Sequence, residues 1–153
     1  MTVFTVTRRL AFAPSDLYPI AADVGSYPSF LPLCTDARIS EMRTDPLGRS
    51  LFHAAVDIAY DKLSLKETFV SEVIADPAAM RIDVLAIGGP VKHLNGFWLF
   101  TPAAGGTDVT FHIDYEMSSR VLQVVMSGMF DYAMRKVLNA FEGRARSLLQ
   151  SRS

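Results

Sequence analysis

Apolar and polar residues alternate along several runs of this chain, and the clearest run spans residues 107–117. One set of alternate positions is apolar or aromatic: Val109, Phe111, Ile113, Tyr115 and Met117. The set between them is polar: Thr110, His112, Asp114 and Glu116. Because successive side chains of a β-strand point to opposite faces, this period of two predicts a strand with one face in the core and the other in water.

Further runs rich in β-branched and aromatic residues predict more strands. The predicted strands span residues 3–10, 37–43, 50–60, 63–74, 80–87, 93–101 and 107–117. From residue 37 onward, short segments containing Gly, Pro or Asp separate them, at 45–48, 60–62, 75–77, 88–90 and 102–106. Links this short favour antiparallel neighbours, because parallel strands need a longer crossover.

Helical spacing follows the first predicted strand. Pro14 suits the first turn of a helix, Leu17 and Ala21 recur at helical spacing, and Gly25 is predicted to end that helix. Residues 26–30 predict a second short helix, which stops before Pro32 because the residue preceding a proline avoids the α region.

The last part of the chain predicts one long helix. Residues 118–150 contain no proline, and their apolar residues recur every three or four positions. This spacing predicts a helix of roughly thirty residues, about 45 Å long.

Together the elements predict an α+β fold with an antiparallel sheet of about seven strands, two short helices after the first strand, and a long C-terminal helix. A chain of 153 residues suits one domain with a buried core. We expect residues 1–150 to form that domain and residues 151–153 to be a frayed tail. Half of the residues are hydrophobic, which argues against disorder.

Charge narrows the choice of partners. The formal net charge is −1, from 15 basic and 16 acidic residues, so the chain has no bulk attraction for nucleic acid or an anionic membrane. We expect no DNA partner. A local RNA-facing patch stays open, because basic residues on several strands could converge on one outer face: Arg8, Arg9, Arg38, Arg43, Arg49, Lys62 and Lys66.

The compartment is predicted from what the chain lacks. Its single cysteine, Cys34, excludes an internal disulfide and suits a reducing environment. The N-terminus has no signal-peptide pattern, and the most apolar stretch, residues 121–130, is about half the ~20 residues of a membrane-spanning helix. We expect a cytoplasmic protein, with peripheral contact at the inner membrane left open.

Two motifs carry a resemblance to a known family. The first is Asp23-Val24, then Tyr27-Pro28, then Phe30-Leu31-Pro32-Leu33-Cys34. The second is Gly89-Pro90, then Leu94-Asn95-Gly96, then Trp98-Leu99-Phe100. With the closing phrase Ala140-Phe141-Glu142-Gly143-Arg144-Ala145, they resemble the coenzyme Q-binding protein family of the START-like superfamily. The resemblance spans about residues 3–149, with departures at Val91, where the family tends to have phenylalanine, and at Leu33, where tryptophan is common.

The resemblance implies a helix-grip fold, in which a curved sheet wraps the C-terminal helix and a cavity can remain between them. It implies binding of ubiquinone or a related polyprenyl quinone, in support of respiratory electron transport or ubiquinone biosynthesis. Bacterial members of the family are also known as RatA-type toxins, which implies binding to the large ribosomal subunit and a block of subunit association. Related helix-grip proteins include polyketide cyclases, so an aromatase or cyclase is a third hypothesis.

A polyprenyl quinone needs a mostly apolar tunnel with one or two polar contacts for its carbonyl oxygens. The candidate lining residues are Phe30, Leu31 and Pro32 near a mouth, Trp98, Phe100, Phe111, Ile113 and Tyr115 on strands, and Val125, Met126, Met129 and Phe130 on the long helix. A cavity-facing Trp98 would offer its indole N–H to a quinone oxygen. The alternative role for all of them is ordinary core, which is the favoured role of Trp98 and Phe100.

No group of residues nominates a catalytic or metal site. His53, His93 and His112 lack metal-ligand spacing, and two of them alternate with phenylalanine and are expected on outer faces. Cys34 has no evident neighbouring base, which favours a buried structural thiol. We therefore predict a non-enzymatic protein with no metal and no cofactor other than the bound quinone.

Overall fold

The computed structural model describes residues 2–60 and 64–150, with Met129 described by its backbone alone. Seven antiparallel strands form one sheet in the order β1-β7-β6-β5-β4-β3-β2. The strands are β1 (Thr2–Leu10), β2 (Cys34–Thr44), β3 (Ser50–Tyr60), β4 (Leu65–Asp76), β5 (Arg81–Gly88), β6 (Val91–Ala103) and β7 (Gly106–Met117). The helices are α1 (Pro14–Ala22), the 3₁₀ helix η1 (Val24–Ser29) and α2 (Arg120–Gln150).

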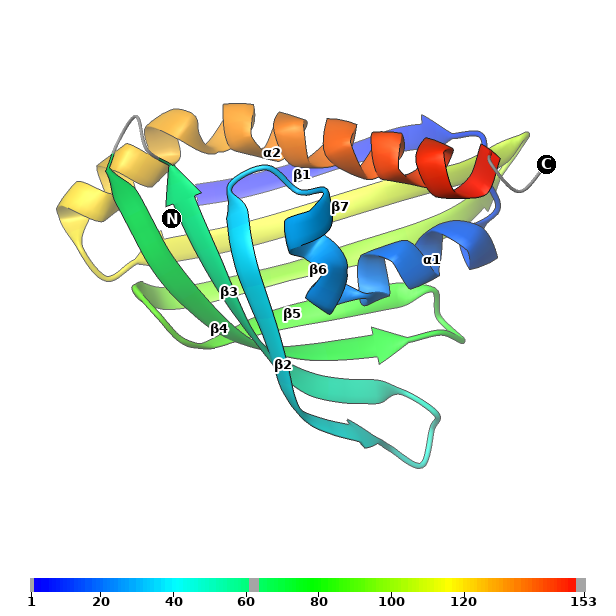
Figure 1. The fold of residues 1–153 in the computed structure, drawn as a ribbon, viewed down its shortest axis with the longest axis horizontal. Helices are drawn as coiled ribbons and strands as arrows, with labels where there is room; N and C mark the ends of the chain where they lie inside the picture. Colours follow the sequence, from blue (N-terminus) through cyan, green and yellow to red (C-terminus); the bar gives the residue numbers. More distant parts are fainter. Residues whose placement is uncertain (1, 61–63, 151–153) are drawn as a thin grey trace.

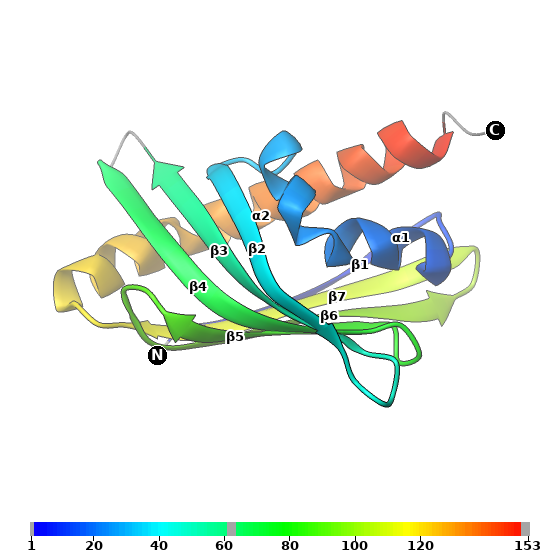
Figure 2. The ribbon, with the colours of Figure 1, turned by 60° about the horizontal axis from the view of Figure 1, so that its bottom comes forward.

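All the helices lie on one side of the sheet. α2 runs along the concave face, while α1 and η1 cover the rest of that face and carry the chain from β1 at one edge to β2 at the other (Figure 1). β2, β3 and β4 bend strongly toward α2 (Figure 2). A register shift between Ser40 and Arg43 interrupts the pairing of β2 with β3, and such irregularities let a strand bend. The predicted fold class, a curved sheet that grips the C-terminal helix, is confirmed.

Because side chains alternate along β6 and β7, every second residue of these strands faces α2. On β6 and β7 the inward residues pair across the strands, Trp98 with Phe111 and Phe100 with Val109.

The turn between β5 and β6 contains Gly89, which has a φ of 111°. A Cβ at this position would lie 2.8 Å from the carbonyl oxygen of Thr68. A glycine is therefore needed at that turn.

Large aromatic side chains fill one half of the concave face. The Trp98 ring lies 4.7 Å from Phe111 and 4.9 Å from Phe141 of α2, measured between ring centroids. Leu17 and Ala21 of α1 join this main core and are fully buried. The core lies under α1 and the C-terminal half of α2.

The predicted end of the first helix is wrong. The first helix ends at Ala22, and Gly25 lies inside η1 without ending α1. Asp23 leaves the helical region, with a ψ of 69°, and its carboxylate accepts a hydrogen bond from the Ser26 hydroxyl at 2.5 Å. A short polar side chain that bonds locally offers the backbone an alternative to the helix. The turn predicted over residues 60–62 lies partly outside the described residues.

Candidate ligand-binding site

A partly open cavity of about 240 Å³ lies between the concave face of the sheet and the N-terminal half of α2. Its wall is almost entirely apolar and draws on six strands or their flanks. The lining residues are Pro32, Leu33, Val56, Ile58, Leu65, Phe69, Ser71, Val84, Leu94, Ile113, Tyr115, Met117, Met126, Phe130, Ala133, Met134 and Val137.

The cavity exists because the inward residues differ in size along the sheet. Under the C-terminal half of α2 the inward positions hold Trp98 and Phe100, and Phe141 of the helix fills the remaining space. At the other end of the face, Ser71 of the sheet and Ala133 of the helix are small, and three methionines, Met117, Met126 and Met134, present flexible side chains. Packing is therefore complete at one end of the helix and incomplete at the other.

Two polar side chains, Ser71 and Tyr115, lie on the described part of the wall. Tyr115 is 1% exposed, and its ring lies 4.7 Å from that of Phe130. Within residues 2–60 and 64–150, its hydroxyl is the buried side-chain polar atom that lacks a hydrogen-bond partner. Leaving such a group unpaired costs about 1–3 kcal/mol.

The segment between η1 and β2 closes one side of the cavity. Pro32 and Leu33 line the wall, and Leu33 has a φ of 71°, a left-handed conformation that is uncommon for a residue with a branched side chain. The carbonyl oxygen of Leu33 accepts a hydrogen bond from the Ala59 N–H at 2.9 Å, which ties the segment to β3. Backbone strain of this kind tends to occur at functional sites.

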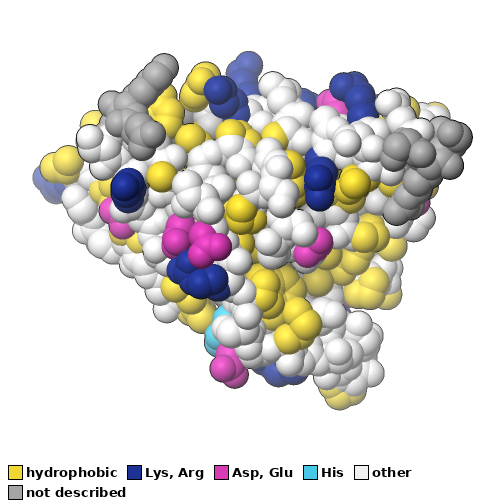
Figure 3. Space-filling view, in the orientation of Figure 1, with side chains coloured by type: hydrophobic (Ala, Val, Ile, Leu, Met, Phe, Trp, Pro, Cys, Tyr) yellow, Lys and Arg dark blue, Asp and Glu magenta, His cyan; other side chains and the backbone are white. Residues whose placement is uncertain are grey.

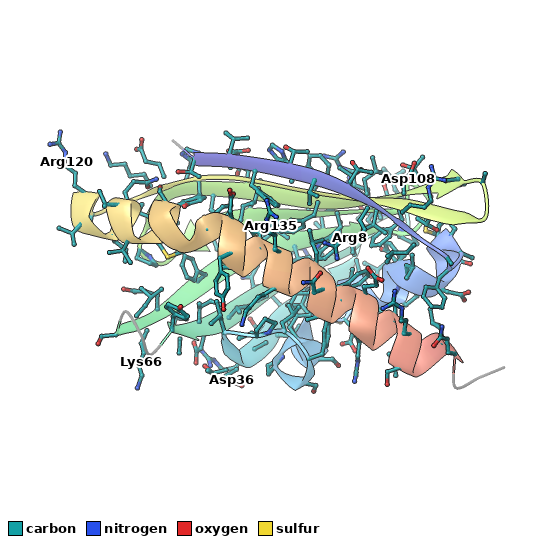
Figure 4. The ribbon with its side chains drawn as sticks, turned by 90° about the horizontal axis from the view of Figure 1, so that it is seen from above. Arg8, Asp36, Lys66, Asp108, Arg120 and Arg135 are labelled. Atoms are coloured by element: carbon teal, nitrogen blue, oxygen red, sulfur yellow. The ribbon has the colours of Figure 1, made fainter. Side chains whose placement is uncertain are left out.

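A surface depression of about 660 Å³ adjoins the cavity between the start of β4 and the start of α2. Leu65 lines both hollows, and Leu122 packs against it from the helix. Val121 and Val125 add apolar surface, while Lys66 and Glu67 make the β4 side polar. Figure 4 shows Lys66 and Arg120 at this same end of the molecule.

Polar contacts hold α2 against β1 and β7. Gln123 accepts a hydrogen bond from the Met117 N–H at 2.6 Å and donates one to the Thr2 hydroxyl at 3.0 Å. Farther along, Arg8, which is labelled in Figure 4, donates a hydrogen bond to Asn139 at 2.9 Å and lies 3.5 Å from Glu142. These contacts hold α2 on the side that faces β1. The depression lies on the other side of α2, which faces β4.

Five of the predicted site residues are on the cavity wall: Pro32, Ile113, Tyr115, Met126 and Phe130. Val125 lines the adjoining depression instead. The side chain of Met129 lies outside the described residues. Whether the five contact a ligand stays a prediction.

The other predicted site residues lie off the wall. Trp98 and Phe100 belong to the main core, with Phe111 and Phe30 packed against it. The Trp98 indole is 4% exposed and packs between Phe111 and Phe141, off the cavity wall. Phe30 lies edge-on to Tyr27, with the Arg144 guanidinium 5.3 Å from its ring centroid. Leu31 is half-buried and does not line the cavity.

Sequence reasoning missed the contribution of β3, β4 and β5, including Val56, Phe69, Ser71 and Val84. Their period of two shows that they face inward, as Val56 follows the buried Phe52 and Ala54 at even positions. The pattern does not say which inward residues are covered by helix side chains and which are left beside a space. That depends on the position of α2.

The groups considered for catalysis lie elsewhere. Burial raises the pKa of the Cys34 thiol from 9.0 to about 11, which keeps it protonated and unreactive at neutral pH. His112 bonds to Asp114 at 2.9 Å and stacks on Phe97, away from the cavity wall. The described residues contain no group of His, Cys, Asp and Glu that could hold a metal ion. Nor does any described helix combine the length and apolar character needed to cross a bilayer.

The five arginines proposed as part of an RNA-facing patch each lie close to an acidic side chain, and Lys62 of that set lies outside the described residues. Arg9 bonds to Asp108 at 2.5 Å, Arg38 to Asp57 at 3.0 Å and Arg49 to Asp45 at 2.6 Å. On the face seen in Figure 3, the Lys and Arg side chains are scattered among neutral and acidic ones. That face presents no continuous basic surface.

The fold is that of a helix-grip domain with an apolar cavity between the sheet and α2. The chain belongs to the family described as polyketide cyclase/dehydrase and lipid transport, whose pattern matches residues 10–142.

Its relatives have names of two kinds. A protein from Rickettsia prowazekii named ribosome association toxin RatA is 32% identical, over 98% of this chain and all of that protein. A protein of the same name from Escherichia coli K12 is 27% identical, over 95% of this chain and 88% of that one. The mitochondrial coenzyme Q-binding protein COQ10 homolog B of Xenopus laevis is 25% identical, over 93% of this chain and 57% of that one.

Solved structures share the architecture. An 18 kDa protein from Caulobacter crescentus, determined in solution, is 33% identical with a TM-score of 0.82, covering 97% of this chain and 98% of that one. The Zhui aromatase/cyclase from Streptomyces sp. R1128 is 20% identical with a TM-score of 0.78, covering 96% of this chain and 95% of that one. At that identity the second likeness concerns the fold alone.

Proposed function

We propose that the protein binds ubiquinone or a related polyprenyl quinone and acts as a non-enzymatic carrier that supports respiratory electron transport and ubiquinone biosynthesis. The observation that carries this proposal is the apolar cavity between the sheet and α2. Such a site takes a neutral, mainly apolar ligand held by few polar contacts. The coenzyme Q-binding name of the Xenopus laevis relative supports the choice of a quinone.

The cavity is large enough for the ring of a polyprenyl quinone but not for its tail as well. An apolar cavity of about 150 Å³ holds one benzene ring, so about 240 Å³ suits a single substituted ring. A polyprenyl tail is too long to share that space. In this proposal the tail leaves past Leu65 and lies in the depression beside Leu122 and Val125.

The residues of the cavity wall suit a carrier better than an enzyme. The described lining residues include no carboxylate, imidazole or thiol, which are the usual general acids, bases and nucleophiles. The likeness to an aromatase/cyclase extends to the fold, and we assign no cyclase activity to this chain.

Filling the cavity tests the proposal. Ala133 is 6% exposed and faces the cavity from α2, where leucine has nearly the same helix propensity. Purified from a host that makes ubiquinone, the wild type should carry the quinone, detected by mass spectrometry of an organic extract. Ala133→Leu should retain about ten-fold less, because overpacking costs about 1–3 kcal/mol.

Ala140→Leu, the same change on the same helix at a half-buried position off the wall, is the matched control. It should retain quinone like the wild type. A wild-type protein without quinone, or equal retention by both variants and the wild type, would contradict the proposal.

Ribosome binding is the second candidate, and the relatives named ribosome association toxin favour it. Contacts to RNA are driven by phosphate neutralisation, which makes them salt-dependent. We propose co-sedimentation with isolated large ribosomal subunits across a salt series. Binding at low salt that weakens as salt rises would support this candidate, and no binding at low salt would exclude it.

A further inference from the structure

The Tyr115 hydroxyl is an anomaly in an otherwise well-satisfied interior. Tyr115 is 1% exposed, lines the cavity, and has no hydrogen-bond partner for its hydroxyl within the described residues. A phenylalanine would fill the same space without the cost of an unpaired phenol, which is about 1–3 kcal/mol. A buried polar group without a partner calls for a specific explanation. Neighbouring side chains close the hydroxyl off from the cavity, so a ligand atom would reach it once the flexible methionines of the wall move aside.

The Tyr115 side chain is held in place. It stands opposite Thr2 of β1 and Leu94 of β6 in the ladder, and its ring packs on Phe130 of α2 at 4.7 Å. The hydroxyl therefore has a fixed position relative to the sheet and helix. A fixed donor pays little conformational entropy when it bonds to a ligand, which makes it suitable for orienting one.

The charge of the wall limits the class of ligand further. Its described lining residues carry no Lys, Arg or His, so nothing there would neutralise a carboxylate or a phosphate. Burial of an unpaired charge is costly, and fatty acids and phospholipid headgroups are therefore disfavoured in the cavity. A neutral ring with a carbonyl oxygen meets both conditions, since it is uncharged and accepts one hydrogen bond.

We infer that the Tyr115 hydroxyl donates a hydrogen bond to a carbonyl oxygen of the bound ring, and so selects neutral carbonyl-bearing ring compounds over hydrocarbons and fatty acids. This inference rests on the proposed quinone binding and adds a specificity-determining residue to it. Ser71, the other polar residue of the wall, is on β4 across the sheet from Tyr115 on β7.

The test compares two probes with one tail. The first is a benzoquinone that carries a decyl chain, and the second is decylbenzene, which lacks the oxygens. Tyr115→Phe should weaken binding of the quinone about ten-fold, because a lost hydrogen bond to a buried partner is worth roughly 1.4 kcal/mol. The same variant should bind decylbenzene at least as well as the wild type does.

Tyr18→Phe is the matched control. Tyr18 is a buried tyrosine of α1 that packs edge-on to Phe100 in the main core, away from the cavity. Removal of its hydroxyl should leave the affinity for both probes unchanged. A general effect of losing a buried hydroxyl would change binding in both variants, so the control separates the local role from a structural one.

Each outcome has a defined meaning. A ten-fold loss confined to the quinone and to Tyr115→Phe supports the inference. Equal quinone affinity of the wild type and Tyr115→Phe overturns the role of Tyr115 and leaves quinone binding standing. Failure of the wild type to bind the quinone overturns the proposed function, and the inference with it.

Discussion

Tyr115, which is buried, and Tyr27, which is half-buried, differ in how their hydroxyls are paired. Tyr27 of η1 donates a hydrogen bond to the carbonyl oxygen of Ala21. Its pKa is raised well above the ordinary value of 10.0, mainly by burial. Tyr115 has no partner for its hydroxyl within the described residues. Tyr27 is therefore a structural residue, and Tyr115 is the residue for which we propose a ligand contact.

This contrast predicts stability changes of opposite sign. Tyr27→Phe removes the hydrogen bond to the Ala21 carbonyl oxygen and should lower the free energy of unfolding by about 1–3 kcal/mol. Tyr115→Phe removes an unpaired polar group and should raise the free energy of unfolding of the ligand-free protein by about 1 kcal/mol. Urea denaturation at equal m-values measures both changes.

Lipid must be removed before that comparison, because a bound ligand stabilises the native state. Destabilisation of the ligand-free protein by Tyr115→Phe would mean that the hydroxyl has a partner inside the protein.

Residue patterns predict which side of the sheet a residue faces and not whether it borders a space. Trp98 and Tyr115 both face inward, yet Trp98 is stacked in the core and Tyr115 lines the cavity. Their neighbours from other elements decide the difference. Phe141 covers Trp98 from α2, whereas Tyr115 and Ser71 border the cavity.

At the scale of elements, α2 has two halves with different roles. The C-terminal half buries Leu138, Phe141 and Ala145 in the main core. The N-terminal half forms the roof of the cavity and exposes Val121 and Val124, at 75% and 73%. Packing of the first half anchors the helix, so the second half can border a space without loss of the fold.

The proposed path of the quinone tail gives a prediction for this half. Val125 lines the depression and Val124 does not, although the two are adjacent on the helix. Val125→Asp should reduce the affinity for a long-tailed quinone about ten-fold, because a charge then faces the apolar tail. It should change the affinity for a tail-less benzoquinone by less than about two-fold.

Val124→Asp is the matched control and should affect neither ligand, since Val124 is already in water. Equal losses for the long-tailed and tail-less quinones, or equal effects of the two variants, would contradict the tail path.

Most elements follow from periodicity, and the exceptions have local causes. The strand from Ser50 to Tyr60 and the long helix agree closely with expectation. The end of α1 does not, because Asp23 leaves the helical region before Gly25 is reached. The local hydrogen bond of one side chain leaves a weaker signal in the sequence than the helical period does. It nevertheless decides where the helix ends.

At the scale of the whole molecule, the antiparallel sheet forms a concave face, and one helix is too narrow to fill it. As predicted, the short links make consecutive strands from β2 to β7 antiparallel neighbours, while β1 pairs with β7 and the β1-to-β2 connection carries α1 across to the far edge. α1 and the C-terminal half of α2 fill part of the face. The site is the part that remains, and it has no motif of its own in the sequence.

The central claim is that a quinone ring occupies this remaining space. The most direct measurement is a set of intermolecular nuclear Overhauser effects between the decyl-substituted benzoquinone and the isotope-labelled protein. The account predicts contacts from the ring substituents to the methyl groups of Ile113, Met126 and Val56, which line three sides of the cavity. Binding without contacts to those methyl groups, or contacts only to residues on the outer face of the sheet, would contradict it.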